Sequence, residues 1–328
     1  MIRHLLLSSR LFGLVVALAF ATSAGAQTLK SGTLSLVVPF AAGGPSDVAG
    51  RILAQGLTDV LGQTVLVENP VGAGGTVGSL RVSRSAPDGG QFVLGNNGTH
   101  SWSQSLYKNP PYDAVTDFTP LGLAVESPRV IIVPKDLPVN TLPEFVAYLK
   151  ANQGRMQFAS AGAGSASHVS CILLHARLGV NVTHVPYRGL GPAMQDLIGG
   201  RVQYICDSVS TSKPQIEEGH VKGIAVTGLK RSPALPAIPT MKEQGVDFDV
   251  LTWQGLFLAR NTPAPIVNQL SLVLARALDL PTVKDRLALL GEEVPAPERR
   301  SPEYFKQFVA GEIARWSGPI KASGVTVE

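Results

Sequence analysis

The stretch Leu34–Arg51, LSLVVPFAAGGPSDVAGR, decides the fold of this chain. Its first residues, Leu34–Val38, are apolar and predict a buried strand, and a glycine-rich loop follows them. A helix is expected to begin at Pro45-Ser46-Asp47, because proline suits the first helical position and an acid suits the first turn. This order of strand, loop and helix directs backbone N–H groups and the positive end of a helix dipole at one point. The stretch therefore predicts an anion site.

The N-terminal segment has the composition of a secretory signal. Arg3 and Arg10 precede an apolar run, Leu11–Phe20. Ala24-Gly25-Ala26 then has the small residues of a cleavage site. The apolar run is shorter than the roughly 20 residues that a membrane-spanning helix needs. We therefore expect cleavage near Ala26 and export of the mature chain, and we expect no membrane helix after it.

Composition narrows the function classes. The chain has 28 Lys or Arg and 24 Asp or Glu, and these charges are scattered instead of forming a basic stripe, which argues against nucleic-acid binding. Cys171 and Cys206 each have apolar neighbours, so buried free thiols are favoured, with one disulfide as the alternative in an exported chain. The sequence has no metal-ligand spacing, and neither a metal nor a cofactor is expected.

Strands and helices alternate along the mature chain, which predicts an α/β fold with a mostly parallel sheet. Two extended segments interrupt this alternation, Leu121–Pro134 and Val250–Ala259, and we interpret each as a crossover between two lobes. The Pro-rich turn Ser232–Pro239 is expected to lead to a short helix. Two crossings between two α/β lobes predict a hinge and a cleft.

The crossovers set the expected domain boundaries. After a signal peptide at residues 1–26, lobe 1 is expected to comprise residues 27–125 plus 251–328, and lobe 2 residues 126–250. Ligands in open α/β sheets bind outside the carboxyl ends of strands, where loops lead into helices. The binding site is therefore expected in such loops.

Three loops of similar composition follow predicted strands: Phe40–Asp47 (FAAGGPSD), Asn96–His100 (NNGTH) and Ser160–His168 (SAGAGSASH). None contains Lys or Arg. Small side chains allow backbone N–H groups to approach a ligand closely, and hydroxyl groups add further donors. Gly and Ser also make ordinary turns and caps. Three such loops at equivalent places in two lobes nevertheless favour a carboxylate site held by neutral donors, helix dipoles and water.

Several single side chains have alternative roles. Asp47 is expected to complement the dipole of its own helix in preference to contacting a ligand. Asp207 either caps the next element or accepts a hydrogen bond from a ligand, because a charge at the end of a buried strand needs a partner. His100 and His168 either donate to a carboxylate or act in packing and capping. Arg188 either meets a distal acid group of the ligand or is solvated.

No catalytic motif accompanies these loops. The dinucleotide, P-loop, zinc-protease and nucleophile-elbow patterns are all missing from the sequence. Ser165, His168 and Asp207 would be the members of a hydrolytic triad. Ser165 and His168 lie one helical turn apart, however, so a capping arrangement is expected in its place. A binding protein is therefore favoured over a serine hydrolase.

Several segments, in order along the mature chain, resemble those of the Bug proteins, which are periplasmic receptors related to the tripartite tricarboxylate transporter binding protein. They include VVPFAAGGPSDVAGRILAQGL, VENPVGAGGTVGS, SAGAGSASH, HVPYRGLGPAMQDLIGGRVQ and EIARWSGPIKASG. The resemblance implies a two-lobed, type II-like periplasmic binding protein with two crossover strands and a central ligand cleft. It also implies a monomer in the periplasm, a small carboxylate ligand, and the membrane permease subunits of a tripartite tricarboxylate-type transporter as partners. A sensor that presents its closed form to a membrane signalling partner is the alternative.

The resemblance further implies where the ligand binds. The first and third loops would hold one carboxylate, partly through water, and the Thr99 loop and Asp207 would lie on the cleft wall. The expected ligand-binding residues are Phe40, Ala41, Ala42, Gly43, Gly44, Ser46, Asp47, Gly98, Thr99, Ser160, Gly164, Ser165, Ser167, His168 and Asp207. The aromatic residues considered for either the cleft or the core are Phe40, Trp102, Tyr187 and Trp253.

Overall fold

The structure is a computed structural model that describes residues 29–327, so the predicted signal segment lies outside the described residues. Nine strands form one sheet in the order β2-β1-β3-β9-β4-β7-β5-β6, with β8 also paired to β4. The strands are β1 (Leu34–Val37), β2 (Val65–Glu68), β3 (Gln91–Asn96), β4 (Phe118–Pro134), β5 (Gln157–Ser160), β6 (Thr183–Pro186), β7 (Tyr204–Ser208), β8 (Val221–Val226) and β9 (Leu251–Ala259).

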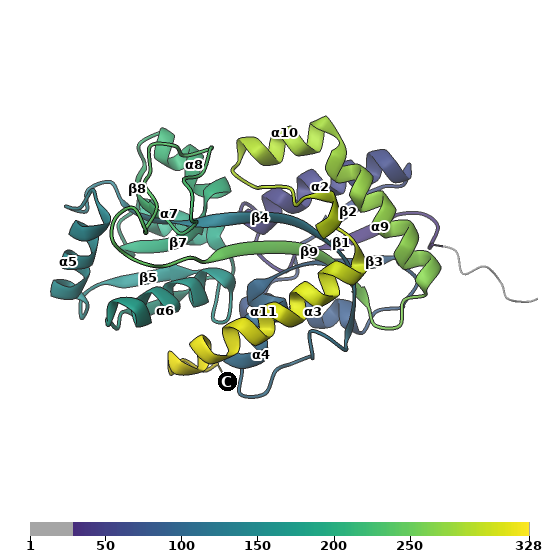
Figure 1. Ribbon diagram of the computed structural model, residues 1–328, viewed down its shortest axis with the longest axis horizontal. Helices are drawn as coiled ribbons and strands as arrows, with labels where there is room; N and C mark the ends of the chain where they lie inside the picture. The colour runs from purple at the N-terminus through teal and green to yellow at the C-terminus, as the bar shows by residue number, and fades with distance from the viewer. Residues whose placement is uncertain (1–28, 328) are drawn as a thin grey trace, which may run out of the picture.

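Helices cover both parts of this sheet (Figure 1). The α-helices are α2 (Pro45–Leu61), α3 (Thr76–Ser83), α4 (Ser103–Leu106), α5 (Leu142–Asn152), α6 (Ala166–Leu178), α7 (Leu190–Ile198), α8 (Val209–Glu217), α9 (Ala264–Asp279), α10 (Pro281–Leu289) and α11 (Pro302–Ala322). Short helical turns are η1 (Ala73–Gly75), η2 (Gly98–Trp102) and η3 (Pro297–Arg299), and η2 has π-helical geometry.

Strand β4 connects two lobes. Its first part, Phe118–Pro128, pairs with β9, whereas Arg129–Ile132 pairs with β7 and Val130–Pro134 with β8. We call the part built on β1, β2, β3, β9 and the start of β4 the first lobe, and the part built on β5 to β8 and the rest of β4 the second lobe. Figure 1 shows β4 and β9 side by side through the middle of the molecule. The predicted α/β fold with two lobes is confirmed.

The sheet is mixed, which corrects the expectation of a mostly parallel one. Within the first lobe β1 pairs in parallel with β2 and β3, and within the second lobe β5 pairs in parallel with β6 and β7. All pairings of β4 and β9 are antiparallel. The two crossover segments supply these antiparallel strands, because each crosses the middle of the sheet in the direction opposite to its neighbours.

Each lobe has its own core, and a further cluster joins them. In the first lobe α2 and α9 bury apolar side chains such as Leu53 and Leu274 against the strands. In the second lobe Phe158 and Leu174 belong to the corresponding core. A smaller cluster near the C-terminal end of α11 packs Trp316 against Trp102 of the first lobe and against α6 of the second. Helix α11 therefore contacts both lobes.

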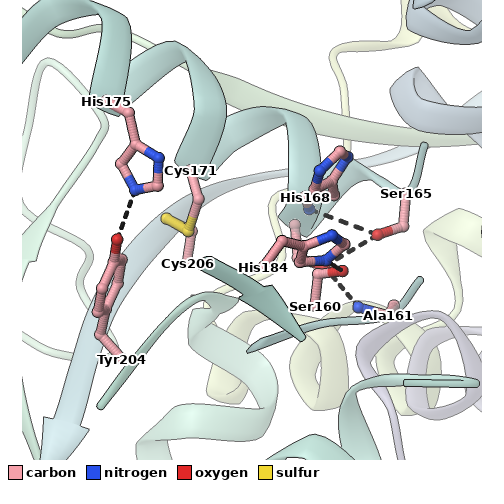
Figure 2. The surroundings of a disulfide bond; sticks show 10 residues. Ser160, Ala161, Ser165, His168, Cys171, His175, His184, Tyr204 and Cys206 are labelled. Atoms are coloured by element: carbon pink, nitrogen blue, oxygen red, sulfur yellow. Dashed lines mark hydrogen bonds between the residues drawn. A yellow bond between two sulfur atoms is a disulfide. The ribbon is translucent and has the colours of Figure 1, made fainter. Parts of the chain in front are cut away.

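A disulfide joins α6 to β7 inside the second lobe, so the preference for free thiols was wrong. Cys171 and Cys206 are bonded, with a Cα–Cα distance of 5.7 Å, and both are buried. Figure 2 shows the bond beside His175 and Tyr204, whose side chains share a hydrogen bond. The sequence could not favour the disulfide, because a separation of 35 residues says nothing of the helix packing that brings the two sulfur atoms together.

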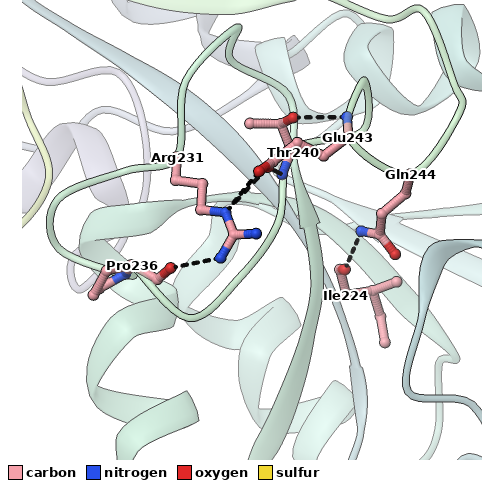
Figure 3. A network of polar contacts seen from close by, with 6 residues as sticks. All are labelled: Ile224, Arg231, Pro236, Thr240, Glu243 and Gln244. Carbon is pink, nitrogen blue, oxygen red and sulfur yellow. Dashed lines mark hydrogen bonds and ion pairs between the residues drawn. The ribbon is translucent and has the colours of Figure 1, made fainter.

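The segment after the Pro-rich turn is a series of turns, so the predicted short helix is absent there. Figure 3 shows how side chains hold it: Arg231 forms an ion pair with Glu243 and donates to the Pro236 carbonyl, while Gln244 donates to the Ile224 carbonyl. Two helices that the sequence analysis did not identify, α8 and α10, are present. Within the described residues, no single helix has the length and apolar composition to cross a membrane, and only α9 and α10 together, across a 64° bend, do.

Candidate functional site

A narrow cavity of about 30 Å³, part of it open to solvent, lies between the lobes. Both lobes contribute to its wall. The lining residues are Phe40, Gly44, Pro45, Ser46, Asn96, Ser127, Arg129, Ala161, Ser165, Ala166, Ser167, Leu190, Ser208, Thr252, Trp253 and Gln254.

The N-termini of two helices face this cavity. Helix α2 begins at Pro45 after Gly44, which provides no side-chain cap, and α6 begins after Ser165. The first turn of a helix leaves N–H groups without intrahelical partners, and its dipole favours an anion. The Ser165 hydroxyl accepts one of these N–H groups, from His168, at 3.4 Å. The two helix starts can therefore hold a carboxylate with backbone donors from both lobes.

The loops around these helix starts touch backbone to backbone across the lobes. A Cβ atom at Gly98 would lie 2.5 Å from the Ala166 nitrogen, and one at Gly74 would lie 2.1 Å from the Ala163 carbonyl oxygen. The Ala41 N–H also donates to the Arg188 carbonyl at 3.1 Å. Glycine is needed at these contacts because any side chain would hold the lobes apart. The geometry is that of a closed cleft.

Arg129 lies in the wall of the cavity with little solvent contact. It is 6% exposed, and its Nε and Nη1 atoms are buried without a hydrogen-bond partner. Burial lowers the pKa of Arg129 to about 10, and the nearby Asp207 and Glu292 act in the opposite direction. The guanidinium is therefore charged at neutral pH. The Gln254 Oε1 atom, on the neighbouring strand β9, is also buried without a hydrogen-bond partner.

Asp207 directly precedes Ser208, the residue before α8, and its carboxylate is bonded within this part of the chain. Its Oδ1 accepts the Ser208 N–H at 2.7 Å, and its Oδ2 accepts the hydroxyls of Thr211 and Ser212, each at 2.8 Å. Burial raises the pKa of Asp207, while these hydrogen bonds and Arg129 oppose that rise. Since both oxygens are occupied within the chain, Asp207 lies behind the cavity wall, and its neighbour Ser208 faces the cavity.

Asp47 holds its own loop together, as the sequence analysis favoured. Its Oδ2 accepts the Gly43 N–H at 3.0 Å and the Arg51 Nε at 2.9 Å, and its Oδ1 accepts the Asn69 amide at 3.1 Å. Burial alone would raise the pKa of Asp47, but these bonds lower it overall. Asp47 therefore fixes the start of α2 and lies outside the cavity wall.

The histidines expected near the cleft are buried and neutral. Burial lowers the pKa of His100 and of His168 to about 3, and His175 and His184 act in the same direction on His168. His168 accepts the Gly164 N–H at its Nδ1 and stacks on His184 with ring centroids 4.0 Å apart (Figure 2). Ser165 bonds to the backbone N–H of His168 and thus caps the helix, as expected from their spacing.

The structure brings five of the predicted site residues to the cavity wall: Phe40, Gly44, Ser46, Ser165 and Ser167. The remaining ten support or adjoin the loops instead: Ala41, Ala42, Gly43, Asp47, Gly98, Thr99, Ser160, Gly164, His168 and Asp207. Thr99, for example, bonds to Asn96 and His100, and Ser160 to His184. Among the aromatic candidates, Phe40 and Trp253 line the cavity, whereas Trp102 is in the core.

Sequence reasoning missed most of the polar wall that β4 and β9 provide. Ser127 and Arg129 come from β4, and Thr252 and Gln254 from β9. Arg129 had a detectable signal, since it is a charge directly before the apolar run Val130–Val133 in a segment interpreted as a crossover between lobes. Arg188, the arginine considered earlier, is exposed and lines a separate depression beside Tyr187.

The described residues contain no group of three or more His, Cys, Asp or Glu side chains placed to hold a metal ion. The chemistry available at the cavity is thus that of hydrogen-bond donors, two helix dipoles and one guanidinium. Such a set of groups is suited to holding an anion.

Comparisons with known proteins agree with this geometry. The family model described as "Tripartite tricarboxylate transporter family receptor" matches residues 49–325. The periplasmic binding protein BugD has a TM-score of 0.88 and 41% identity, over 91% of this chain and 100% of that one. MatC from Rhodopseudomonas palustris, solved with bound malate, has a TM-score of 0.87 and 40% identity, over 89% of this chain and 100% of that one.

A further protein from R. palustris, solved with adipate, has a TM-score of 0.85 and 32% identity, over 90% of this chain and 98% of that one. These likenesses extend over 89–91% of this chain and thus through both lobes. Because the family model covers most of the chain and the structural relatives cover both lobes, this chain belongs to the tripartite tricarboxylate transporter receptor family, in agreement with its resemblance to the Bug proteins.

Proposed function

We propose that this chain is a periplasmic receptor that closes on a small carboxylate-bearing solute and presents it to the membrane permease subunits of a tripartite tricarboxylate-type transporter. The observation that carries this proposal is the cavity between the lobes, into which α2 and α6 both direct their N-termini. The malate and adipate bound by two relatives support a carboxylate as the ligand class.

The proposed lobes comprise residues 27–125 plus 251–328 and residues 126–250. Ligand binding favours the closed form because a carboxylate between the helix starts makes contacts with both lobes that an open form cannot provide together. In the proposed site Ser46, Ser165 and Ser167 and the N–H groups beside them hold one carboxylate. Asp47, His168 and the other loop residues act by keeping those donors in place.

Catalysis by Ser165 has little support in this arrangement. A nucleophilic serine needs a base within hydrogen-bond reach, but the Ser165 hydroxyl bonds to a backbone N–H and the His168 Nδ1 accepts from Gly164. We therefore propose a binding role without catalysis. The chain is further proposed to act as a monomer that engages its membrane partner in the closed form.

Thermal stability of the mature protein, refolded to remove carried-over ligand, tests the binding role. The panel contains aliphatic dicarboxylates and tricarboxylates, acidic amino acids, and aromatic and pyridine carboxylates with their amides. A ligand that binds only the folded state adds ~2.7 kcal/mol of stability at a hundredfold excess over Kd. We expect a clear rise in Tm for one carboxylate class, and a folded protein that responds to none of them would refute the proposal.

Cell fractionation and crosslinking test location and partner. We expect the mature protein in the periplasmic fraction with a new N-terminus near Gln27. Crosslinking in the presence of the ligand is expected to capture a permease subunit. Capture of a membrane signalling protein would instead support the sensor alternative.

A further inference from the structure

We infer that Arg129 binds the second carboxylate of a dicarboxylate ligand, so that this receptor selects dianions over matched monoanions. The inference rests on the proposed function and adds a chemical class and a named residue to it. The observation behind it is that the buried guanidinium of Arg129 lines the ligand cavity and has N–H groups that donate to no acceptor in the protein.

Arg129 lies where β4 changes partners between the lobes. Pro128 is the last β4 residue paired with β9, opposite Leu251, and Arg129 is the first paired with β7, opposite Ser208. The Arg129 backbone N–H is fixed by the Thr227 hydroxyl at 2.9 Å. The side chain thus projects from a well-anchored strand into the wall of the cavity, on which Ser127 and Ser208 also lie.

The donors of Arg129 are removed from water without being satisfied by the protein. The residue is 6% exposed, and both Nε and Nη1 are fully buried with no partner. A buried charge without a partner is strongly unfavourable, and buried arginine is normally paired with a carboxylate. A ligand carboxylate in the cavity would supply the missing acceptor, with the planar geometry that a guanidinium recognises best.

The nearby acids of the protein do not fill that role. Both oxygens of Asp207 are taken by Ser208, Thr211 and Ser212. Glu292 accepts the Ser208 hydroxyl at 3.3 Å with its Oε1, and its Oε2 is buried without a hydrogen bond to Arg129 or to any other residue. Among the ion pairs of residues 29–327, none includes Arg129.

These two acids act on Arg129 through their charge and make no hydrogen bond to it. Burial raises the pKa of Asp207 and of Glu292, so burial disfavours their negative charge. Arg129 keeps its own charge, because burial lowers its pKa only to about 10. Asp207 and Glu292 thus leave two donors of Arg129 without an acceptor, which a ligand carboxylate in the cavity would supply.

The two anion-binding parts of the cavity differ in kind. The starts of α2 and α6 offer neutral donors and dipoles, whereas β4 offers a full positive charge. A monocarboxylate can satisfy one of them only. A dicarboxylate satisfies both at once and links the helix starts to the crossover strand. Selection then comes from the penalty of leaving Arg129 buried and unpaired.

Paired probes that differ by one charge test the inference. Isothermal titration of the ligand-free mature protein at pH 7.5 compares succinate, glutarate and adipate with their monoamides, which keep the length but carry one carboxylate. For the diacid that binds best, we expect the wild type to bind its monoamide at least 10-fold more weakly. Arg129→Gln should weaken binding of that diacid by about 30-fold or more, as when one partner of a buried charge pair is lost. The affinity of Arg129→Gln for the monoamide should stay within threefold of wild type.

Two further variants keep the test decisive. Arg129→Lys retains the charge and should retain the preference for the diacid, with lower affinity because the planar fork is lost. Arg231→Gln removes one positive charge from the exposed Arg231–Glu243 pair shown in Figure 3, and should change no affinity by more than twofold. The wild-type comparison of diacid with monoamide needs no variant, so it remains informative even if Arg129→Gln does not fold.

The contrary outcomes separate the two proposals. Equal affinity of the wild type for diacid and monoamide overturns the role of Arg129 and leaves a carboxylate receptor intact. Equal losses for diacid and monoamide in Arg129→Gln also overturn it, because a packing defect would act on both. A folded wild type that binds no diacid and no monoamide, nor any other carboxylate of the wider panel, refutes the proposed function itself.

Discussion

Gly98 of the first lobe lies directly against Ala166 at the start of α6 in the second lobe, where a Cβ atom would come within 2.5 Å of the Ala166 nitrogen and 3.0 Å of the Ser165 carbonyl carbon. Both contacts are with backbone, which cannot move aside as a flexible side chain would. Gly98 belongs to η2, a π-helical turn, and such turns often occur at functional sites. The closed cleft therefore depends on the absence of a side chain at position 98.

The first prediction follows from this contact. Gly98→Ala should weaken binding of the preferred carboxylate by about tenfold, because relieving an overpacked contact of this kind costs at least ~1.4 kcal/mol. Isothermal titration measures the change. Gly318→Ala is the control, since a Cβ there meets nothing within 4 Å. Unchanged affinity in Gly98→Ala would show that ligand binding does not require this contact between lobes.

The second prediction separates the capping role of Ser165 from its role at the cavity. Ser165 and Ser301 both cap helices, α6 and α11 respectively, by accepting a backbone N–H three residues on. Ser165→Ala and Ser301→Ala should each lower the free energy of unfolding by ~1 kcal/mol. Only Ser165→Ala should weaken carboxylate binding, because only Ser165 lines the cavity. Urea unfolding and titration check both parts, and equal affinities in the two variants would contradict the proposed site.

The third prediction concerns the disulfide. Replacing Cys171 and Cys206 together by alanine should lower the free energy of unfolding by about 2–4 kcal/mol, since the bond closes a loop with a sequence separation of 35 in the unfolded chain. Urea unfolding of the oxidised protein and of the double variant measures this. Mass spectrometry of the wild type, alkylated without reduction, should find no free thiol. Two alkylated cysteines would mean that the bond does not form.

The fourth prediction is an acid-sensitive stability. Burial holds the pKa of His100 and His168 at about 3 and that of His175 and His184 at about 4, compared with ~6.5 in an unfolded chain. The unfolded state therefore binds more protons below pH ~6.5. The free energy of unfolding should fall as the pH drops from about 6.5 toward about 4, by up to ~1.4 kcal/mol per pH unit for each imidazole.

Urea unfolding at pH 7.5, 6 and 5 measures that slope. His100→Phe should reduce the pH dependence of the free energy of unfolding by the contribution of one proton. The new phenyl ring can take the place of the imidazole, which stacks on Phe257 with ring centroids 4.0 Å apart. Above pH ~6.5 the histidines should have no effect on the slope, because they are then neutral in both states. A stability that is flat between pH 7.5 and pH 5 would mean that these histidines are protonated in the folded protein.

Much of the first lobe was predictable because its signals are local. In Leu34–Arg51 the apolar strand, the glycine loop, the proline at the first helical position and the acid in the first turn lie within 18 residues. The structure begins β1 at Leu34 and α2 at Pro45, as predicted. The two extended crossover segments were recognisable for the same reason, since a long extended segment in a chain of alternating strands and helices is a local pattern.

Local patterns did not predict which loop residues face the cavity. Gly43 and Gly44 are adjacent and alike in sequence, yet only Gly44 reaches the cavity, because Asp47 and Asn69 hold the loop in one orientation. Similarly, Ser208 faces the cavity, whereas the carboxylate of Asp207 accepts the hydroxyls of Thr211 and Ser212. Which member of such a pair meets the ligand depends on contacts made with distant parts of the chain.

The order of residues in this chain sets its strand and helix starts, its two crossovers and its family, because each of these follows from patterns within short segments. The packing of distant segments sets the bond between Cys171 and Cys206, the antiparallel middle of the sheet and the unpaired charge of Arg129. The reason is that a partner for a thiol, a strand edge or a buried cation is a neighbour in space, and spacing along the chain does not specify which neighbour that will be.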